Sequence, residues 1–244
     1  MNGTSAPAAQ VVNWGEPPAH EEVCMEFRLI YDGPLRSGQA SGISADKHAI
    51  RKDIHQQLKQ LWEVNPDLKM RSEPHSILNA PKAEGVPGQT GYQVTTAAAI
   101  QRPSLWETLG NEFRRCNYRF VPLVSNHLRL TCSLDVLLLW RDKIVPIGPT
   151  GDIDNRLKTL FDALQVPQSC SDVDPPAQND DFLFVLLEDD NLITDVRVTT
   201  DRLLTPYVAT PGPGASHPEN VVHLVINVKV HPGIVLFDNV AFLS

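Results

Sequence analysis

The most informative stretch of the sequence is Gly151-Asp-Ile-Asp-Asn-Arg-Leu-Lys-Thr-Leu-Phe-Asp-Ala-Leu164. Its apolar residues recur every three or four positions, which is the spacing of one face of an α-helix. Asp152 stands where a helix N-cap would stand, and Gly151 loosens the backbone before it. We therefore expect a helix over residues 151–164 with one face packed into a core.

Asp154 and Lys158 lie one turn apart on the rim of this predicted helix, between its apolar face and solvent. A carboxylate there suits Mg²⁺, which usually takes one or two protein carboxylates and completes its shell with water and phosphate oxygens. A structural interpretation is also open, because acidic residues in a first turn complement the helix dipole and Asp154 with Lys158 is an ordinary i,i+4 ion pair. Taken alone, the helix favours the structural interpretation.

A second acidic pair, Asp189-Asp190, precedes a strand-like run over residues 192–198. We expect this pair at a strand edge beside the start of the helix. Converging carboxylates repel one another unless a cation neutralises them. The two acidic stretches together therefore favour a metal site.

These elements, taken in order, resemble the signature of the RusA-type Holliday junction resolvases. That signature joins an Asp-x-Asp-Asn, a lysine four residues after the second Asp, a Phe-Asp-Ala-Leu helix and a later Asp-Asp pair. The matching residues here are Asp152 to Asn155, Lys158, Phe161 to Leu164 and Asp189-Asp190, with Ile193 three residues on. The resemblance implies an α+β fold, a RusA-like mixed sheet of about four strands with helices packed on it, in the order β-α-β-α-β-β with insertions.

The same resemblance implies a Mg²⁺-dependent endodeoxyribonuclease, with Mn²⁺ able to replace Mg²⁺, that hydrolyses phosphodiester bonds in branched DNA during recombination and repair. It implies a homodimer whose subunits nick opposite strands of a four-way junction. Asp190 is favoured over Asp189, because it places Ile193 where the family has an aliphatic residue. The residues implied are Asp152, Asp154, Lys158 and Asp190 for catalysis and Asp152, Asp154, Asp190 and Asp189 for the metal; Asn155, Arg141, Lys143 and Arg156 are candidates for contacts with nucleic acid.

The net charge of −8 is unusual for a protein that binds a polyanion, because such binding usually leaves a basic footprint. The family has a basic run directly before its Asp-x-Asp, where this chain has residues 144–150 without a single charge. Local basic patches can still act; the candidates are Arg51-Lys52, Arg114-Arg115 with Arg119, and Arg141 with Lys143. Two alternatives stay open: a nuclease of the same fold acting on another structured nucleic acid, and a non-catalytic protein that binds DNA or a partner.

The composition, 244 residues with 42% hydrophobic content, predicts a globular protein with a sizeable core. We expect a flexible lead over residues 1–21 and one domain over 22–244, with insertions at about 67–120 and 165–181. The sequence contains no apolar run of about 18 residues and no secretory signal, so we expect a cytoplasmic protein without a membrane span. The four cysteines form no CxxC pair and are predicted to be free thiols: Cys24, Cys116, Cys132 and Cys170.

The remaining elements follow from periodicity and turn signals. Strands are expected at residues 23–31, 128–140, 192–203 and 221–230, and helices at 45–64, with Ser44 as cap, and at 104–115; residues 182–187 form a short apolar run that ends at the acidic pair. Residues 67–103 are expected to hold little regular structure. No HExxH, P-loop or nucleophile-elbow motif occurs, which argues against a zinc hydrolase, a P-loop nucleotide-binding protein and a serine hydrolase.

Overall fold

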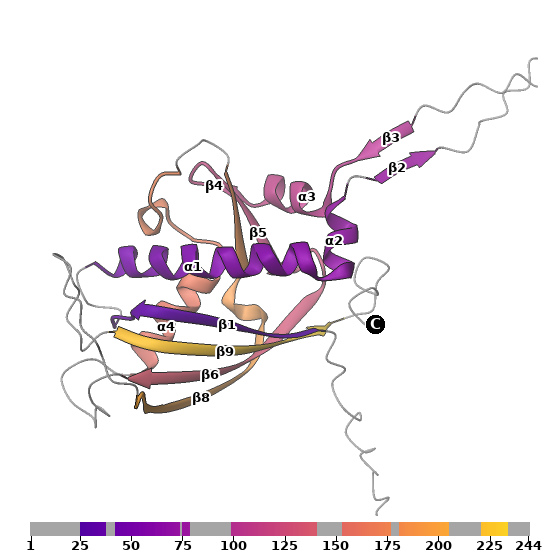
Figure 1. Ribbon diagram of the computed structural model, residues 1–244. Coiled ribbons are helices and arrows are strands. Elements are labelled where there is room, and N and C mark those ends of the chain that lie inside the picture. Colours follow the sequence, from indigo (N-terminus) through magenta and orange to yellow (C-terminus); the bar gives the residue numbers. More distant parts are fainter. Residues whose placement is uncertain are drawn as a thin grey trace, which may run out of the picture.

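A computed structural model describes residues 25–37, 42–73, 75–78, 99–140, 153–176, 181–204 and 221–233. Across these ranges the chain is α+β, with four α-helices and three sheets (Figure 1). None of the helices in this part of the chain is long and apolar enough to cross a lipid bilayer.

The main sheet has four strands in the order β1-β9-β6-β8 and is mixed, as the sequence predicts. Strands β1, β9 and β6 pair antiparallel, whereas β8 runs parallel to β6. Side chains alternate across it, so Val136 of β6 is buried while its neighbour Asp135 is exposed. The strands are β1 Met25–Pro34, β6 Leu130–Trp140, β8 Ile193–Arg202 and β9 Val221–Pro232.

A second sheet, of three strands in the order β4-β5-β7, carries much of the remaining core. Its strands are β4 Arg114–Arg115, β5 Tyr118–Val124 and β7 Asp181–Leu187, and β5 runs parallel to β7. The sequence does not predict β5, because a parallel strand buried on both faces shows no alternation and because Pro122 argues against a strand. It predicts only a short apolar run where β7 lies.

The expectation that residues 67–103 hold little regular structure is wrong at both ends of that range. Helix α2 covers Pro66–Ser72, and β2 His75–Leu78 pairs antiparallel with β3 Ala99–Arg102. The side chain of Asn65 caps α2 by accepting hydrogen bonds from the backbone N–H groups of Asp67 and Leu68. Residues 79–98 lie outside the described part of the chain.

The other helices are α1 Ile43–Val64, α3 Leu105–Glu112 and α4 Ile153–Leu164. Helix α1 buries one face against β1, β7 and α4, and α3 begins with a capping box between Ser104 and Glu107. The predicted cap of α1 is wrong. Its N-cap is Gly42, which has no side chain, and the Ser44 hydroxyl donates instead to the Asp172 carboxylate at 3.1 Å.

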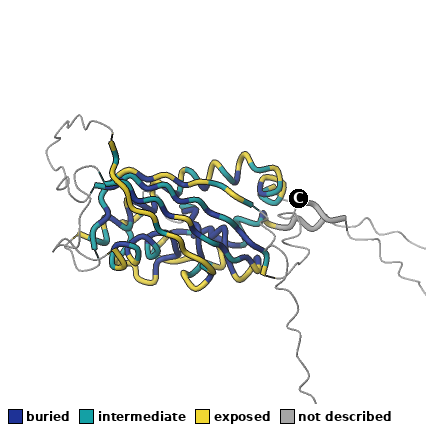
Figure 2. The backbone as a smooth tube through the Cα atoms, turned by 90° about the horizontal axis from the view of Figure 1, so that it is seen from below, coloured by how far each residue is buried: buried dark blue, intermediate teal, exposed yellow. Residues whose placement is uncertain are grey.

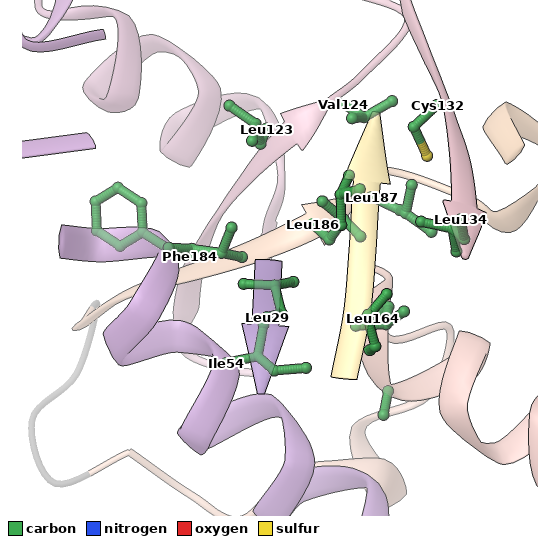
Figure 3. Close-up of a cluster of buried hydrophobic side chains, with 14 of the residues drawn as sticks. Leu29, Ile54, Leu123, Val124, Cys132, Leu134, Leu164, Phe184, Leu186 and Leu187 are labelled. Atoms are coloured by element: carbon green, nitrogen blue, oxygen red, sulfur yellow. The ribbon is translucent and has the colours of Figure 1, made fainter. Parts of the chain in front are cut away.

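One hydrophobic core joins the two larger sheets and the helices between them (Figure 3). Leu29 from β1, Ile54 from α1 and Leu164 from α4 gather there with Leu134 from β6 and Leu186 from β7. Because every one of these elements contributes to the same core, their relative positions are coupled.

Cys116 and Cys170 form a disulfide with a Cα–Cα distance of 5.3 Å, so the prediction of free thiols is wrong for this pair. Cys116 lies in the turn between β4 and β5, and Cys170 begins the 3-10 helix η1, Cys170–Asp172. Sequence spacing could not reveal the pair, because the cysteines are 54 positions apart in the sequence and only the fold brings the turn to η1. Cys132 is free and buried, and Cys24 lies outside the described residues.

The disulfide predicts a measurable loss of stability when it is removed. Cys116→Ser/Cys170→Ser should lower the free energy of unfolding by about 2–4 kcal/mol, because the closed loop no longer restricts the unfolded chain. Urea denaturation with and without dithiothreitol measures the loss. Reductant should lower the free energy of unfolding of the wild type and leave that of the double variant unchanged. An equal free energy of unfolding for both proteins without reductant would contradict the presence of the disulfide.

Candidate functional site at the two ends of helix α4

Helix α4 presents the predicted pair Asp154 and Lys158 to solvent. Both side chains are exposed on one face, whereas Leu160, Ala163 and Leu164 on the opposite face are buried in the core. Asp154 accepts a hydrogen bond from the backbone N–H of Asn155 at 2.8 Å, which fixes its carboxylate in the first turn. The structure therefore places Asp154 and Lys158 on the exposed side of α4 as the sequence predicts, with the half-buried Asn155 next to Asp154.

Three other predicted residues fall outside the described part of the chain. They are Asp152, which the metal and catalytic assignments share, and Arg141 and Lys143, which are candidates for nucleic-acid contacts.

Asp189 and Asp190 lie at the opposite end of α4. The backbone N–H of Asp190 donates to Oε1 of Gln165 at 2.9 Å, and Gln165 is the first residue after the helix. Gln165 also forms a parallel bridge with Leu187, the last residue of β7. The Asp189 carboxylate accepts the backbone N–H of Asn191 at 3.1 Å and so caps the 3-10 helix η2, Asp190–Leu192.

The length of α4 separates the two acidic stretches. Asp154 and Gln165 are eleven positions apart, which is about 16 Å along a helix axis. The main sheet shows the same separation: Arg156 in the first turns of α4 lies over Trp140 at the end of β6, whereas Ile193, three residues after Asp190, pairs with Cys132 near the start of that strand. Oxygens that share one Mg²⁺ lie within about 4 Å of one another, so Asp154 and Asp190 are too far apart.

The expectation that Asp190 lies beside the start of the helix is therefore wrong. Residues 165–167 run alongside the end of β7, so the chain leaves β7 next to the last turn of α4. Within the described ranges, no group of three His, Cys, Asp or Glu side chains could hold a metal ion. The full set of four carboxylates does not fit one Mg²⁺ site, whereas Asp154 together with Asp152 would meet the one or two carboxylates that Mg²⁺ usually takes.

Arg156 is not a surface residue, and its assignment as a nucleic-acid contact is wrong. Its side chain is 3% exposed, its guanidinium lies 4.9 Å from the ring centroid of Trp140, and its Nη1 donates to the backbone carbonyl of Leu35. Burial lowers the pKa of this guanidinium. Arg156 instead fastens the first turns of α4 to the ends of β1 and β6.

The structure also contains a buried polar contact that the sequence analysis missed. Arg51 of α1 is 1% exposed and donates to the backbone carbonyls of Asp162 and Asp172, at 2.8 and 3.0 Å. Arg51 therefore cannot contribute to the basic patch predicted for Arg51-Lys52. Helical spacing could have predicted that Arg51 is buried, since position 51 falls on the same face of the helix as the apolar Ile54 and Leu58.

No protein-family model, curated protein or solved structure matches this chain.

The buried position of Arg156 predicts a stability effect and not a binding effect. Arg156→Met should lower the free energy of unfolding by about 1–3 kcal/mol, because the Leu35 carbonyl loses its buried donor. Lys158→Met is the matched control on the exposed face and should change it by no more than about 0.5 kcal/mol. Urea denaturation measures both; equal stability of the two variants would contradict the placement of Arg156.

Proposed function

We propose that this chain is a Mg²⁺-dependent endonuclease acting on branched DNA, with its active site at the N-terminus of α4. The observation that carries the proposal is the exposed pair of Asp154 and Lys158 on a helix whose other face is held in the core. A carboxylate and an ammonium group one turn apart on a rigid element suit a metal ion and a phosphate side by side. The RusA-type signature around them points to four-way junctions as the substrate.

The roles of the residues follow from their chemistry. Asp154, with Asp152 before it, would hold Mg²⁺, and the bound ion would polarise the scissile phosphate and lower the pKa of an attacking water. Lys158 would place its positive charge beside the phosphate oxygens, where negative charge develops as the bond breaks. The hydrogen bond from the Asn155 N–H would keep the Asp154 carboxylate oriented.

Asp190 takes no part in this proposed active site, which is a departure from the RusA-type pattern. Its N–H bond to Gln165 and the cap supplied by Asp189 order the turn that leads into β8. A homodimer that nicks opposite strands remains part of the proposal through the resemblance alone.

A cleavage assay on synthetic four-way junctions and linear duplex, with Mg²⁺ or EDTA, tests the proposal. Metal-dependent nicking of the junction should fall by about 100-fold or more in Asp154→Asn, because the metal loses a ligand, and Asp190→Asn should retain it within about threefold because Asp190 lies elsewhere. Cutting of other structures would favour a nuclease with a different nucleic-acid substrate. Equal loss in the two variants would contradict the location of the active site.

A second candidate is a non-catalytic protein that binds DNA or a partner. It is favoured by the separation of Asp154 from Asp190 and by the net charge of −8. In that case the wild type cuts none of the substrates, and the only role of Asp154 is to place a negative charge at the positive end of the α4 dipole. Asp154→Asn should then lower the free energy of unfolding by about 0.3–1 kcal/mol, with no change in metal binding.

A further inference from the structure

Strand β8 forms one edge of the main sheet, and none of the described residues pairs with its outer side. It is ten residues long, and all of them are exposed except Ile193 and Val198, which are half-buried. Figure 1 places β8 at the lower edge of the sheet, and Figure 2, seen from below, looks toward that edge. Alternate residues of such a strand direct their N–H and C=O groups outward, which makes the strand a template for another strand.

The opposite edge of the sheet, β1, is blocked. The backbone N–H of Ile30 donates to Oε1 of Gln57 at 2.9 Å, and Nε2 of Gln57 donates to the Ile30 carbonyl at 2.6 Å. A side chain from α1 thus occupies the outward groups of Ile30, in the middle of β1, where an added strand would need them. β8 also lacks the proline and lysine residues that commonly protect an edge.

The charges along β8 can pair with those of a second, antiparallel copy of the same strand. Asp195 and Arg197 are two positions apart, so they lie on the same face of the sheet, and both are exposed. Neither forms an ion pair with another described residue of its own chain. An antiparallel partner carrying the same sequence can place each of these charges opposite its counterpart.

Charge and exposure select one register for such a pair. A two-fold axis perpendicular to the sheet passes through one residue, and residues equidistant from it lie opposite each other. An axis at Arg197 sets that arginine against itself, and an axis at Val198 sets Asp195 against Asp201. An axis at Thr199 pairs Arg197 with Asp201 but sets Val196 against Arg202.

An axis at Val196 sets opposite charges against each other and also brings exposed apolar side chains together. It pairs Asp195 with Arg197 twice on one face, and on the other face it sets Val196, which is 39% exposed, against the same residue of the second copy. We propose that β8 pairs antiparallel with β8 of a second copy of this chain, centred on Val196, so that two four-stranded sheets form one continuous sheet. The pairing supplies an interface for the homodimer of the proposed function, but it is argued only from the strand edges and their charges, so a monomeric wild type and an absence of nuclease activity are separate outcomes.

Sedimentation equilibrium of the full chain tests the pairing through charge reversal. The wild type should be a dimer, Arg197→Asp should raise the dissociation constant at least tenfold because like charges then face each other, and Asp195→Arg/Arg197→Asp should restore the dimer. Arg28→Asp on the blocked edge is the matched control and should leave the dimer unchanged. A monomeric wild type, or a dimer that Arg197→Asp does not weaken, would overturn the proposal.

A cross-linking experiment tests the register. Directly opposite residues in antiparallel strands have Cα atoms about 4.5–5.5 Å apart, which is within disulfide range. Val196→Cys should therefore form a dimeric disulfide under mild oxidation, and Thr199→Cys should not, with oxidised wild type as background. Efficient cross-linking of Thr199→Cys alone would overturn the register centred on Val196.

Discussion

The buried guanidinium of Arg51 is the interaction on which the arrangement around α4 depends. A charge inside a protein is costly unless hydrogen bonds replace its lost water. Here one nitrogen binds the Asp162 carbonyl in the last turn of α4, where the helix dipole is negative, and another binds the Asp172 carbonyl in η1. Burial lowers the pKa of Arg51 to about 10, so the group stays charged near neutral pH. A single side chain of α1 therefore positions both α4 and η1.

Neighbouring contacts extend this connection. Lys47, one turn before Arg51, forms ion pairs with the carboxylates of Asp162 and Asp172 at 2.9 and 3.5 Å. The disulfide between Cys116 and Cys170 holds η1 to the turn before β5, the strand with which β7 pairs. The end of β7 and the acidic pair that follows it are thereby held at the C-terminus of α4. Arg156 fixes the other end of the helix, so the two acidic stretches are kept apart by a rigid element.

Local patterns in the sequence predicted the elements whose signal is local. β6 and β9 alternate strictly, and α1 and α4 show long helical periodicity, so these elements lie close to where the sequence predicts them. Arg156 was misassigned although helical spacing alone puts it on the buried face with Leu160 and Ala163.

Other features could not be predicted, because they depend on contacts between distant segments. β5 is apolar without alternation from Phe120 to Val124, and its parallel partner β7 lies far along the chain. The position of Asp190 depends on the path from residue 165 to β7, which no short pattern encodes. The resemblance to a RusA-type signature thus predicted which residues share the face of α4, but not which end of the helix the second acidic pair occupies.

The proposed site at one end of α4 includes Asp154 and excludes Asp190. Anomalous diffraction from crystals grown with Mn²⁺ tests it most directly, because Mn²⁺ accepts the same oxygen ligands as Mg²⁺ and its position appears without assumptions about the protein. We expect a peak within coordination distance of the Asp154 carboxylate and none beside Asp190. A single ion coordinated by both carboxylates, or no ion at Asp154, would contradict it.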